Sequence, residues 1–334
     1  MKIQVNETNT RGERTRFIPH GLAEAFAVAF RAGGARGNIC RVPGGLILAL
    51  LLAAMLCPPY VSDAASLETE GIDIPHTVGI GQPFLVRLAF PYLVDAMEIT
   101  WNERSVKPTV SHENGSSHAI ALLGTRLKME PCRMPIQITV AFNGQTEVYE
   151  QEITIVPHEY QEEALSLEPR LVTPPEEVKD RIHGERELAL QAINTVSPDR
   201  MWEVPFSLPV KGKMLSRFGL YRVYNGDVRA RHKGLDFRAY LGTPVSSIAP
   251  GKVVLVGDFY FAGNCVYIDH GNGVVSNYVH LSSVSVQEGD ILHAGQEIGL
   301  SGSTGRATGA HLHLGVFVQG VCVDPEPLFT LGEQ

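Results

Sequence analysis

The sequence predicts a mainly β protein in which two β domains are joined by a helical linker. Short runs rich in β-branched and aromatic residues recur between turn residues from residue 72 to 156. After Trp202, strand-like runs again alternate with glycines, and no long helical period occurs. The predicted divisions are a leader at 1–64, a β-sandwich at 65–160, a helical linker at 161–204 and an all-β domain at 205–334.

Length, composition and charge narrow the class of protein. A chain of 334 residues favours two domains over one, and a charged content of 19% is ordinary for a globular protein. The formal net charge of −8, without long basic runs, argues against a nucleic-acid partner. Five cysteines are too few for a disulfide scaffold, and the absence of a C-x-x-C pair disfavours a cysteine zinc ribbon.

The N-terminal segment resembles a secretory signal. Basic side chains precede an aliphatic run, in the order Arg31, Arg36, Arg41 and Leu46–Leu56. The run is too short to span a hydrocarbon layer of about 30 Å, and Ser62-Asp63-Ala64 offers a cleavage site before Ala65. The alternative, a buried core helix, has no amphipathic pattern to support it. We therefore expect export to the periplasm or cell envelope without a stable transmembrane anchor.

Export would place three cysteines of the exported chain in an oxidising compartment. These are Cys132, Cys265 and Cys322. Three cysteines can form at most one disulfide within the chain. The predicted pair is Cys265–Cys322, since both lie in strand-like contexts of the C-terminal half. The alternative is that all three are small buried apolar side chains.

The first β domain is expected to be a sandwich of immunoglobulin-like type, because its short strands recur at regular spacing. Its clearest strands are 84–90, 97–101, 136–140 and 148–156, with turns at Gly81, Asn114-Gly115 and Asn143-Gly144. No catalytic constellation is visible there, and His112 and His118 are expected at the surface.

The linker contains the pattern Thr173-Pro-Pro-Glu176, which predicts a helix with Thr173 as cap and Glu176 in the capping-box position. The helix is expected to reach about Val196 and to stop at Pro198. Its mixed Glu, Lys and Arg content predicts a solvated, bridging helix.

The second β domain holds four residues of metal-binding type. Because His311 and His313 are two apart, both rings would share one face of a strand while Leu312 and Leu314 face a core. An alternative is a pair of surface histidines on an edge strand. His232 and Asp236 strengthen the metal interpretation, since two imidazoles and a carboxylate can hold zinc and leave a position open for water.

His280 adds a fifth candidate and is expected to share a strand face with Tyr278. Half of the twelve histidines lie between residues 232 and 313, which core packing does not readily explain. His270 and His293 are predicted to be structural. The glycine-rich segment 299–305 lacks the lysine of a P-loop, so no nucleotide site is expected.

Residues 209–328 resemble the zinc metallopeptidases of family M23, the lysostaphin/LytM type. The motifs that carry the resemblance are, in chain order, Ser216-Arg-Phe-Gly219, His232-x-x-x-Asp236, Gly242-Thr-Pro-Val245, Asp269-His-Gly271, Tyr278-x-His280-Leu281, Gly295-Gln-x-Ile-Gly299, Gly302-Ser-Thr-Gly305 and His311-Leu-His313. The insertion Arg222–Gly226 and the N-terminal region are similar to two-domain members of the Gram-negative envelope.

The resemblance implies that His232, Asp236 and His313 bind one zinc ion, and that His280 and His311 are the catalytic histidines that do not bind it. It implies an all-β peptidase domain that hydrolyses peptide cross-links of peptidoglycan, with the peptide stems as substrate. Zinc-activated water would attack the peptide carbonyl, and imidazoles would transfer protons. Which of His280 and His311 is the general base stays open.

Two other functions are compatible with part of this residue pattern. Some relatives act as non-catalytic regulators of cell-wall amidases after losing metal ligands, but all five expected residues are present here. Two histidines and a carboxylate also suit an Fe(II) oxygenase, against which export and the two further histidines argue. The N-terminal domain is expected to bind the wall, dock an envelope protein partner or restrain activity as a lid.

Overall fold

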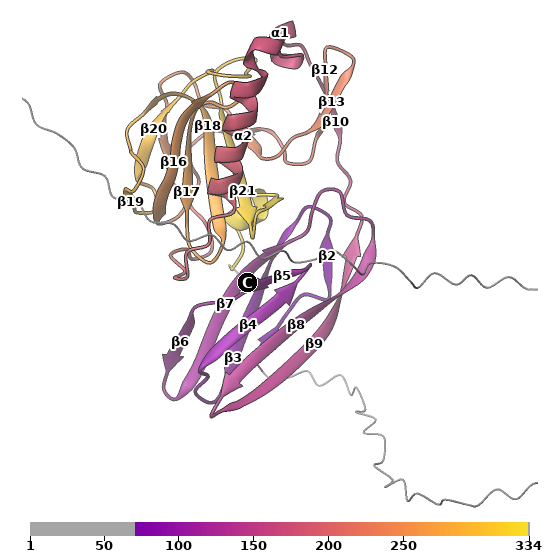
Figure 1. The fold of residues 1–334 in the computed structure, drawn as a ribbon, viewed down its shortest axis with the longest axis vertical. Helices are drawn as coiled ribbons and strands as arrows, with labels where there is room; N and C mark the ends of the chain where they lie inside the picture. The colour runs from indigo at the N-terminus through magenta and orange to yellow at the C-terminus, as the bar shows by residue number, and fades with distance from the viewer. Residues whose placement is uncertain (1–70, 333–334) are drawn as a thin grey trace, which may run out of the picture. The chain divides into compact units, whose positions relative to one another are not determined.

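The structure is a computed structural model that describes residues 71–332. The predicted leader and its cleavage site lie outside the described residues. The described helices include none with the length and hydropathy needed to span a bilayer. The described chain is mainly β, as the sequence predicted (Figure 1).

Residues 72–156 form two sheets. The first contains β1 (Ile72–Asp73), β3 (Pro83–Phe90), β7 (Ser116–Gly124) and β6 (Val110–Glu113), in that order. The second contains β2 (Thr77–Gly79), β9 (Gln145–Val156), β8 (Cys132–Phe142), β4 (Ala96–Trp101) and β5 (Arg104–Val106). Adjacent strands are antiparallel except β2 and β9.

One apolar cluster, which includes Val86, Ile99 and Ile136, takes side chains from both sheets. The predicted Asn-Gly turns close the β6–β7 and β8–β9 hairpins, with positive φ at both residues of each turn. The two-layer β arrangement thus follows from alternating burial and turn chemistry. The immunoglobulin-like classification stays a prediction.

The linker differs from its predicted form. It contains β10 (Glu162–Leu165), the short helix α1 (Pro169–Val172), a 3₁₀ turn (Glu176–Val178) and helix α2 (Lys179–Ile193). The predicted cap at Thr173 was wrong, because Thr173 is extended and closes α1 instead. Consecutive prolines hold the residues before them out of the α region, so helical structure starts only after Pro175.

Helix α2 has the predicted solvated character, with Ala192 as its one buried residue. It lies along the sheet formed by the C-terminal region (Figure 1), where Ala192 packs with Leu255 and Cys265. The helix therefore covers part of one sheet face.

The C-terminal region is all-β up to a final 3₁₀ turn, Glu326–Phe329. Its main sheet has ten strands, with the central order β11 (Met214–Ser216), β14 (Leu235–Phe237), β21 (Leu312–Val318), β18 (Val274–Val284), β17 (Gly263–Asp269), β16 (Gly251–Phe259) and β19 (Ile291–Leu292). Three further strands attach to it, β15 (Pro244–Ser246), β20 (Glu297–Ser301) and β22 (Val321–Val323).

A separate small sheet joins the linker to this region. Strand β10 pairs in parallel with β12 (Tyr221–Tyr224), which pairs with β13 (Val228–Arg231). The sequence did not predict a strand in the linker. This pairing fixes residues 162–165 beside the insertion Arg222–Gly226. The residue boundaries of the predicted domains stay predictions.

The predicted Cys265–Cys322 disulfide is absent, and both residues are free thiols. Cys265 lies on β17 and Cys322 on β22, with β18 and β21 between them in the sheet. Three strand spacings of about 4.8 Å far exceed the Cα separation of about 7 Å that a disulfide tolerates. The alternative of small buried side chains holds for Cys265, whereas Cys132 is exposed.

Candidate active site

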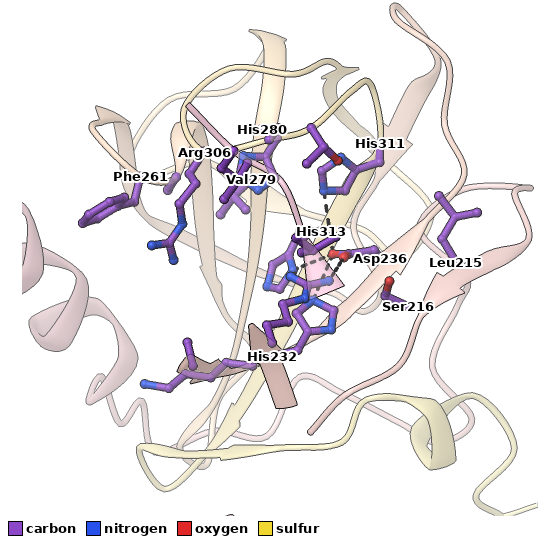
Figure 2. Close-up of a pocket in the computed structure, with 18 of the residues that line it drawn as sticks. Leu215, Ser216, His232, Asp236, Phe261, Val279, His280, Arg306, His311 and His313 are labelled. Carbon is purple, nitrogen blue, oxygen red and sulfur yellow. Dashed lines mark hydrogen bonds and ion pairs between the residues drawn. The ribbon is translucent and has the colours of Figure 1, made fainter. Parts of the chain in front are cut away.

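The side chains of His232, Asp236 and His313 converge where β14 pairs with β21. Asp236 and His313 are direct cross-strand partners, and His232 enters from the loop after β13. His232 Nε2 lies 3.0 Å from Asp236 Oδ1 and 3.0 Å from His313 Nδ1, and His313 Nδ1 lies 2.8 Å from Asp236 Oδ1. Figure 2 shows the three side chains pointing toward one another.

The tight path between His232 and Asp236 depends on Gly234. A Cβ atom there would lie 2.3 Å from the Leu314 carbonyl oxygen and 2.6 Å from His313 Nε2. A larger residue would therefore push β14 away from β21 and separate the two halves of the cluster. The sequence predicted this close path from the segment Lys233–Leu235.

The donor chemistry of the cluster fits a divalent metal such as zinc. His232 donates its Nδ1–H to the Arg217 carbonyl at 2.7 Å, which leaves Nε2 as the free nitrogen. Burial lowers the pKa of His313 to about 4, so its imidazole is neutral at pH 7. Burial raises the pKa of Asp236, but the close approach of His232 and His313 outweighs burial and holds that pKa well below its usual range. One carboxylate and neutral imidazoles are the protonation states that bind metal.

The second oxygen of Asp236 has its own support. Arg222 donates from Nη2 to Asp236 Oδ2 and from Nε to Glu163 Oε2, the latter at 2.8 Å. Ser216 donates its hydroxyl to the other Glu163 oxygen at 2.8 Å. Sequence reasoning assigned no role to Glu163 or Arg222, because only the pairing of β10 with β12 brings them together.

His280 and His311 lie beside this cluster, with ring centroids 4.9 Å apart. His311 Nε2 lies 3.8 Å from Asp236 Oδ1. Each donates its Nδ1–H to a backbone carbonyl at 2.8 Å, Thr304 for His280 and Gly309 for His311. Burial, with His311 and His313 nearby, lowers the pKa of His280 to about 3. The structure thus brings together all five residues singled out in the sequence.

The prediction that His280 shares a strand face with Tyr278 was wrong. Tyr278 is fully buried, and its hydroxyl accepts a hydrogen bond from the Ile248 N–H at 2.8 Å. His280 instead has φ of 64°, and the pairing of β18 is irregular on both sides of it. This left-handed residue breaks the alternation and turns the imidazole into the cleft.

The alternation predicted for His311-Leu-His313 holds. Leu312 and Leu314 are fully buried in the core, while both histidines line the cleft. His270 and His293 are absent from that cleft. His270 is completely buried and contacts the Pro250 carbonyl and the Ser276 hydroxyl, each at 2.7 Å, so its structural role is one of core hydrogen bonding. His293 is exposed.

The five residues line one cleft of about 690 Å³. Its walls come from β10, β12, the segment 306–311 and strands β18 and β21. The volume lies in the ordinary range for sites that bury a ligand of small-molecule or short-peptide size.

Comparison with known proteins agrees with the sequence resemblance. Residues 230–325 match the model of peptidase family M23. Peptidoglycan DD-endopeptidase ShyA of Vibrio cholerae is 43% identical over 111 residues, which are 33% of this chain and 26% of that protein. DD-carboxypeptidase/endopeptidase Mpg of Neisseria meningitidis is 45% identical over 94 residues, 28% of this chain and 22% of that protein.

The fold extends the likeness beyond the matched segment. An M23 peptidase structure from Pseudomonas aeruginosa aligns with a TM-score of 0.55 and 27% identity, over 73% of this chain and 92% of that one. By sequence, this chain spans about a quarter of the length of the curated relatives that it matches. The chain therefore carries a domain of peptidase family M23, matched over residues 230–325.

Proposed function

We propose that this protein is an exported, zinc-dependent endopeptidase that hydrolyses peptide cross-links of peptidoglycan in the cell envelope. The observation that carries the proposal is the convergence of His232, Asp236 and His313 beside two further histidines in one cleft of an M23 domain. The matched relatives named as peptidoglycan DD-endopeptidases support the substrate class.

Each residue has a separate task in this proposal. His232, Asp236 and His313 would hold the zinc ion, which when bound supplies Lewis acidity and a water of lowered pKa. His280 and His311 carry the proton chemistry, because each has Nδ1 tied to a carbonyl and Nε2 left as the free nitrogen. Between them they accept a proton from the attacking water, stabilise the oxyanion and return a proton to the leaving amine.

The intact cluster disfavours the alternative of a non-catalytic amidase regulator. That alternative rests on lost metal ligands, whereas the three ligand-type atoms here lie within 4.8 Å of one another.

Digestion of purified peptidoglycan tests the proposal. The mature protein should release cross-link fragments that mass spectrometry identifies, and a chelator should abolish release until zinc is restored. His313→Ala should lose bound zinc together with activity. His311→Ala should keep zinc, measured by elemental analysis, and lose cleavage by about 100-fold to 10,000-fold. Intact peptidoglycan after digestion with zinc-loaded protein would reject the assignment.

A further inference from the structure

A second chemical feature of the cleft is a cation without an anionic partner. Arg306 follows β20 in the segment that leads to His311, and its side chain lines the cleft. Its guanidinium carbon lies 4.4 Å from the Phe261 ring centroid and 5.1 Å from the Tyr224 ring centroid. Within residues 71–332 no side-chain hydrogen bond or ion pair of Arg306 is formed.

The nitrogens of Arg306 open onto the cleft. Among the described residues no side-chain nitrogen or oxygen is both sealed from solvent and without a hydrogen-bond partner. Because the Arg306 nitrogens have no such partner, they reach solvent, and the solvent beside them is that of the cleft. Figure 2 shows Arg306 and Phe261 on one side of the histidine cluster, with Leu215 and Ser216 on the other.

The aromatic neighbours preorganise this guanidinium. Cation–π contacts with Phe261 and Tyr224 restrain the position of the group, while its N–H donors form no hydrogen bond within residues 71–332. The backbone is also held, because the Arg306 N–H donates to the Phe261 carbonyl at 2.8 Å. A fixed guanidinium with a free edge is suited to bidentate binding of a carboxylate.

The charge of the cleft favours an anion. Its lining includes the basic residues Arg222, Arg231, Lys233 and Arg306 but only the acidic residues Glu163 and Asp236, and Arg222 pairs with both of these. Burial, with a contribution from Arg222, lowers the pKa of Arg306, yet an arginine in a protein stays charged. A half-buried cation without an ion-pair partner among residues 71–332 is poorly solvated, so an anion supplied by the substrate would stabilise it.

We propose that Arg306 is a specificity-determining residue that binds a carboxylate of the substrate peptide, on the His280 side of the zinc-binding cluster. The inference rests on the proposed peptidoglycan substrate, whose peptide stems would carry the carboxylate. It assigns to Arg306 a role in binding, separate from zinc binding and from proton transfer.

The probe is the disaccharide-peptide dimer released from purified peptidoglycan by a muramidase, compared with the same dimer after carboxyl amidation. Binding to the zinc-loaded protein is measured by calorimetry in the His311→Ala background, so that the dimer is not consumed. Arg306→Gln removes the charge at similar size, and Arg306→Lys keeps the charge without the planar fork. Arg126→Gln, at an exposed site outside the cleft, is the matched control.

The protein with Arg306 should bind the carboxylate dimer about tenfold to a hundredfold more tightly than the amidated dimer. Arg306→Gln should bind both forms equally, Arg306→Lys should keep part of the preference, and zinc content should not change. A purely structural role would weaken both dimers alike and leave the preference intact. Equal binding of both dimers by the Arg306 protein, or a preference that survives in Arg306→Gln, overturns the inference.

Two outcomes separate this inference from the proposed function. If the protein prefers the carboxylate dimer but cleaves no peptidoglycan, the proposed activity fails while the assignment of Arg306 stands. If cleavage occurs without any preference, only the assignment of Arg306 fails. Should Arg306→Gln not fold, Arg306→Lys decides alone, because an unchanged preference in that variant also overturns the assignment.

Discussion

At the scale of single residues, the metal-binding capacity depends on how the two oxygens of Asp236 are shared. Oδ1 faces His232 and His313, while Oδ2 accepts a hydrogen bond from Arg222. Arg222 in turn donates a second hydrogen bond to Glu163. A carboxylate held in this way presents one oxygen to a metal in a fixed direction. Glu163 thus supports the proposed zinc-binding cluster although it belongs to β10 and not to the matched peptidase segment.

Glu163→Gln should therefore weaken zinc binding. The neutral amide would hold Arg222 less firmly, and changes in such supporting groups typically cost about tenfold or more in metal affinity. Competition with a chromophoric chelator measures the zinc dissociation constant directly. The matched control is Glu162→Gln, because Glu162 is an exposed neighbour on the same strand. Equal zinc affinity for the two variants would remove Glu163 from this role.

At the scale of elements, buried hydrogen bonds fix the β17–β18 hairpin to the strand before it. His270, in the turn after β17, joins the Pro250 carbonyl before β16 to the Ser276 hydroxyl on β18. Burial lowers the pKa of His270 from 6.5 to about 4, so the folded protein keeps a neutral imidazole where the unfolded chain would be protonated. The hairpin should consequently be sensitive to acid.

Because the pKa of His270 is lower in the folded protein, the stability of the fold should decrease as the pH falls below 6.5. The stabilising contribution of neutral His270 is complete above pH 6.5 and is lost as the pH falls toward about 4, because only the unfolded state takes up the proton in that interval. The loss is at most about 3 kcal/mol. Urea unfolding at pH 7.5 and pH 4.5 measures it.

His270→Gln is the comparison for this prediction. It should be less stable at pH 7.5 but should lose less stability between the two pH values. The difference between the proteins isolates His270 from the other groups that titrate in the same interval. Parallel losses in the two proteins would contradict the predicted contribution.

At the scale of the whole described chain, the N-terminal sheets and the C-terminal region share a core. Leu85 and Leu122, from β3 and β7, are buried in the same apolar cluster as Trp202 and Phe218. Gln82 also donates to Asp324 across this contact at 3.1 Å. Since β10 supplies Glu163 as well, a fragment that starts at residue 200 would lose both core contacts and support for the proposed zinc-binding cluster. It would therefore be a poor test of the hypothesis that the N-terminal region restrains activity.

Residues 71–332 should accordingly unfold as one cooperative unit. Leu122→Ala should cost about 2–5 kcal/mol because it opens a cavity in the shared core. The two tryptophans report on different cores, Trp101 in the N-terminal sheets and Trp202 in the shared cluster, so Trp101→Phe and Trp202→Phe variants follow each separately. Leu93→Ala, at a site that is 57% exposed, is the control and should change stability little. Separate transitions for the two tryptophans would contradict a shared core.

The sequence by itself determined the mainly β fold and the Asn-Gly turns, and it singled out five residues that meet in one cleft, whose separate roles stay predictions. Period-two burial, turn residues and the order of short motifs are local properties, so they can be read along the chain. The predicted helix start at Thr173 was wrong, because the prolines that follow Thr173 disfavour the α conformation of the residues before them.

Only the tertiary structure decided the remaining features. The bulge at His280, the distance between Cys265 and Cys322, the support of Asp236 by Glu163 and the aromatic contacts of Arg306 all depend on which strands become neighbours. Those neighbours lie far apart in sequence, and strand pairing is set by long-range packing and register. A single sequence carries no local signal for such pairing.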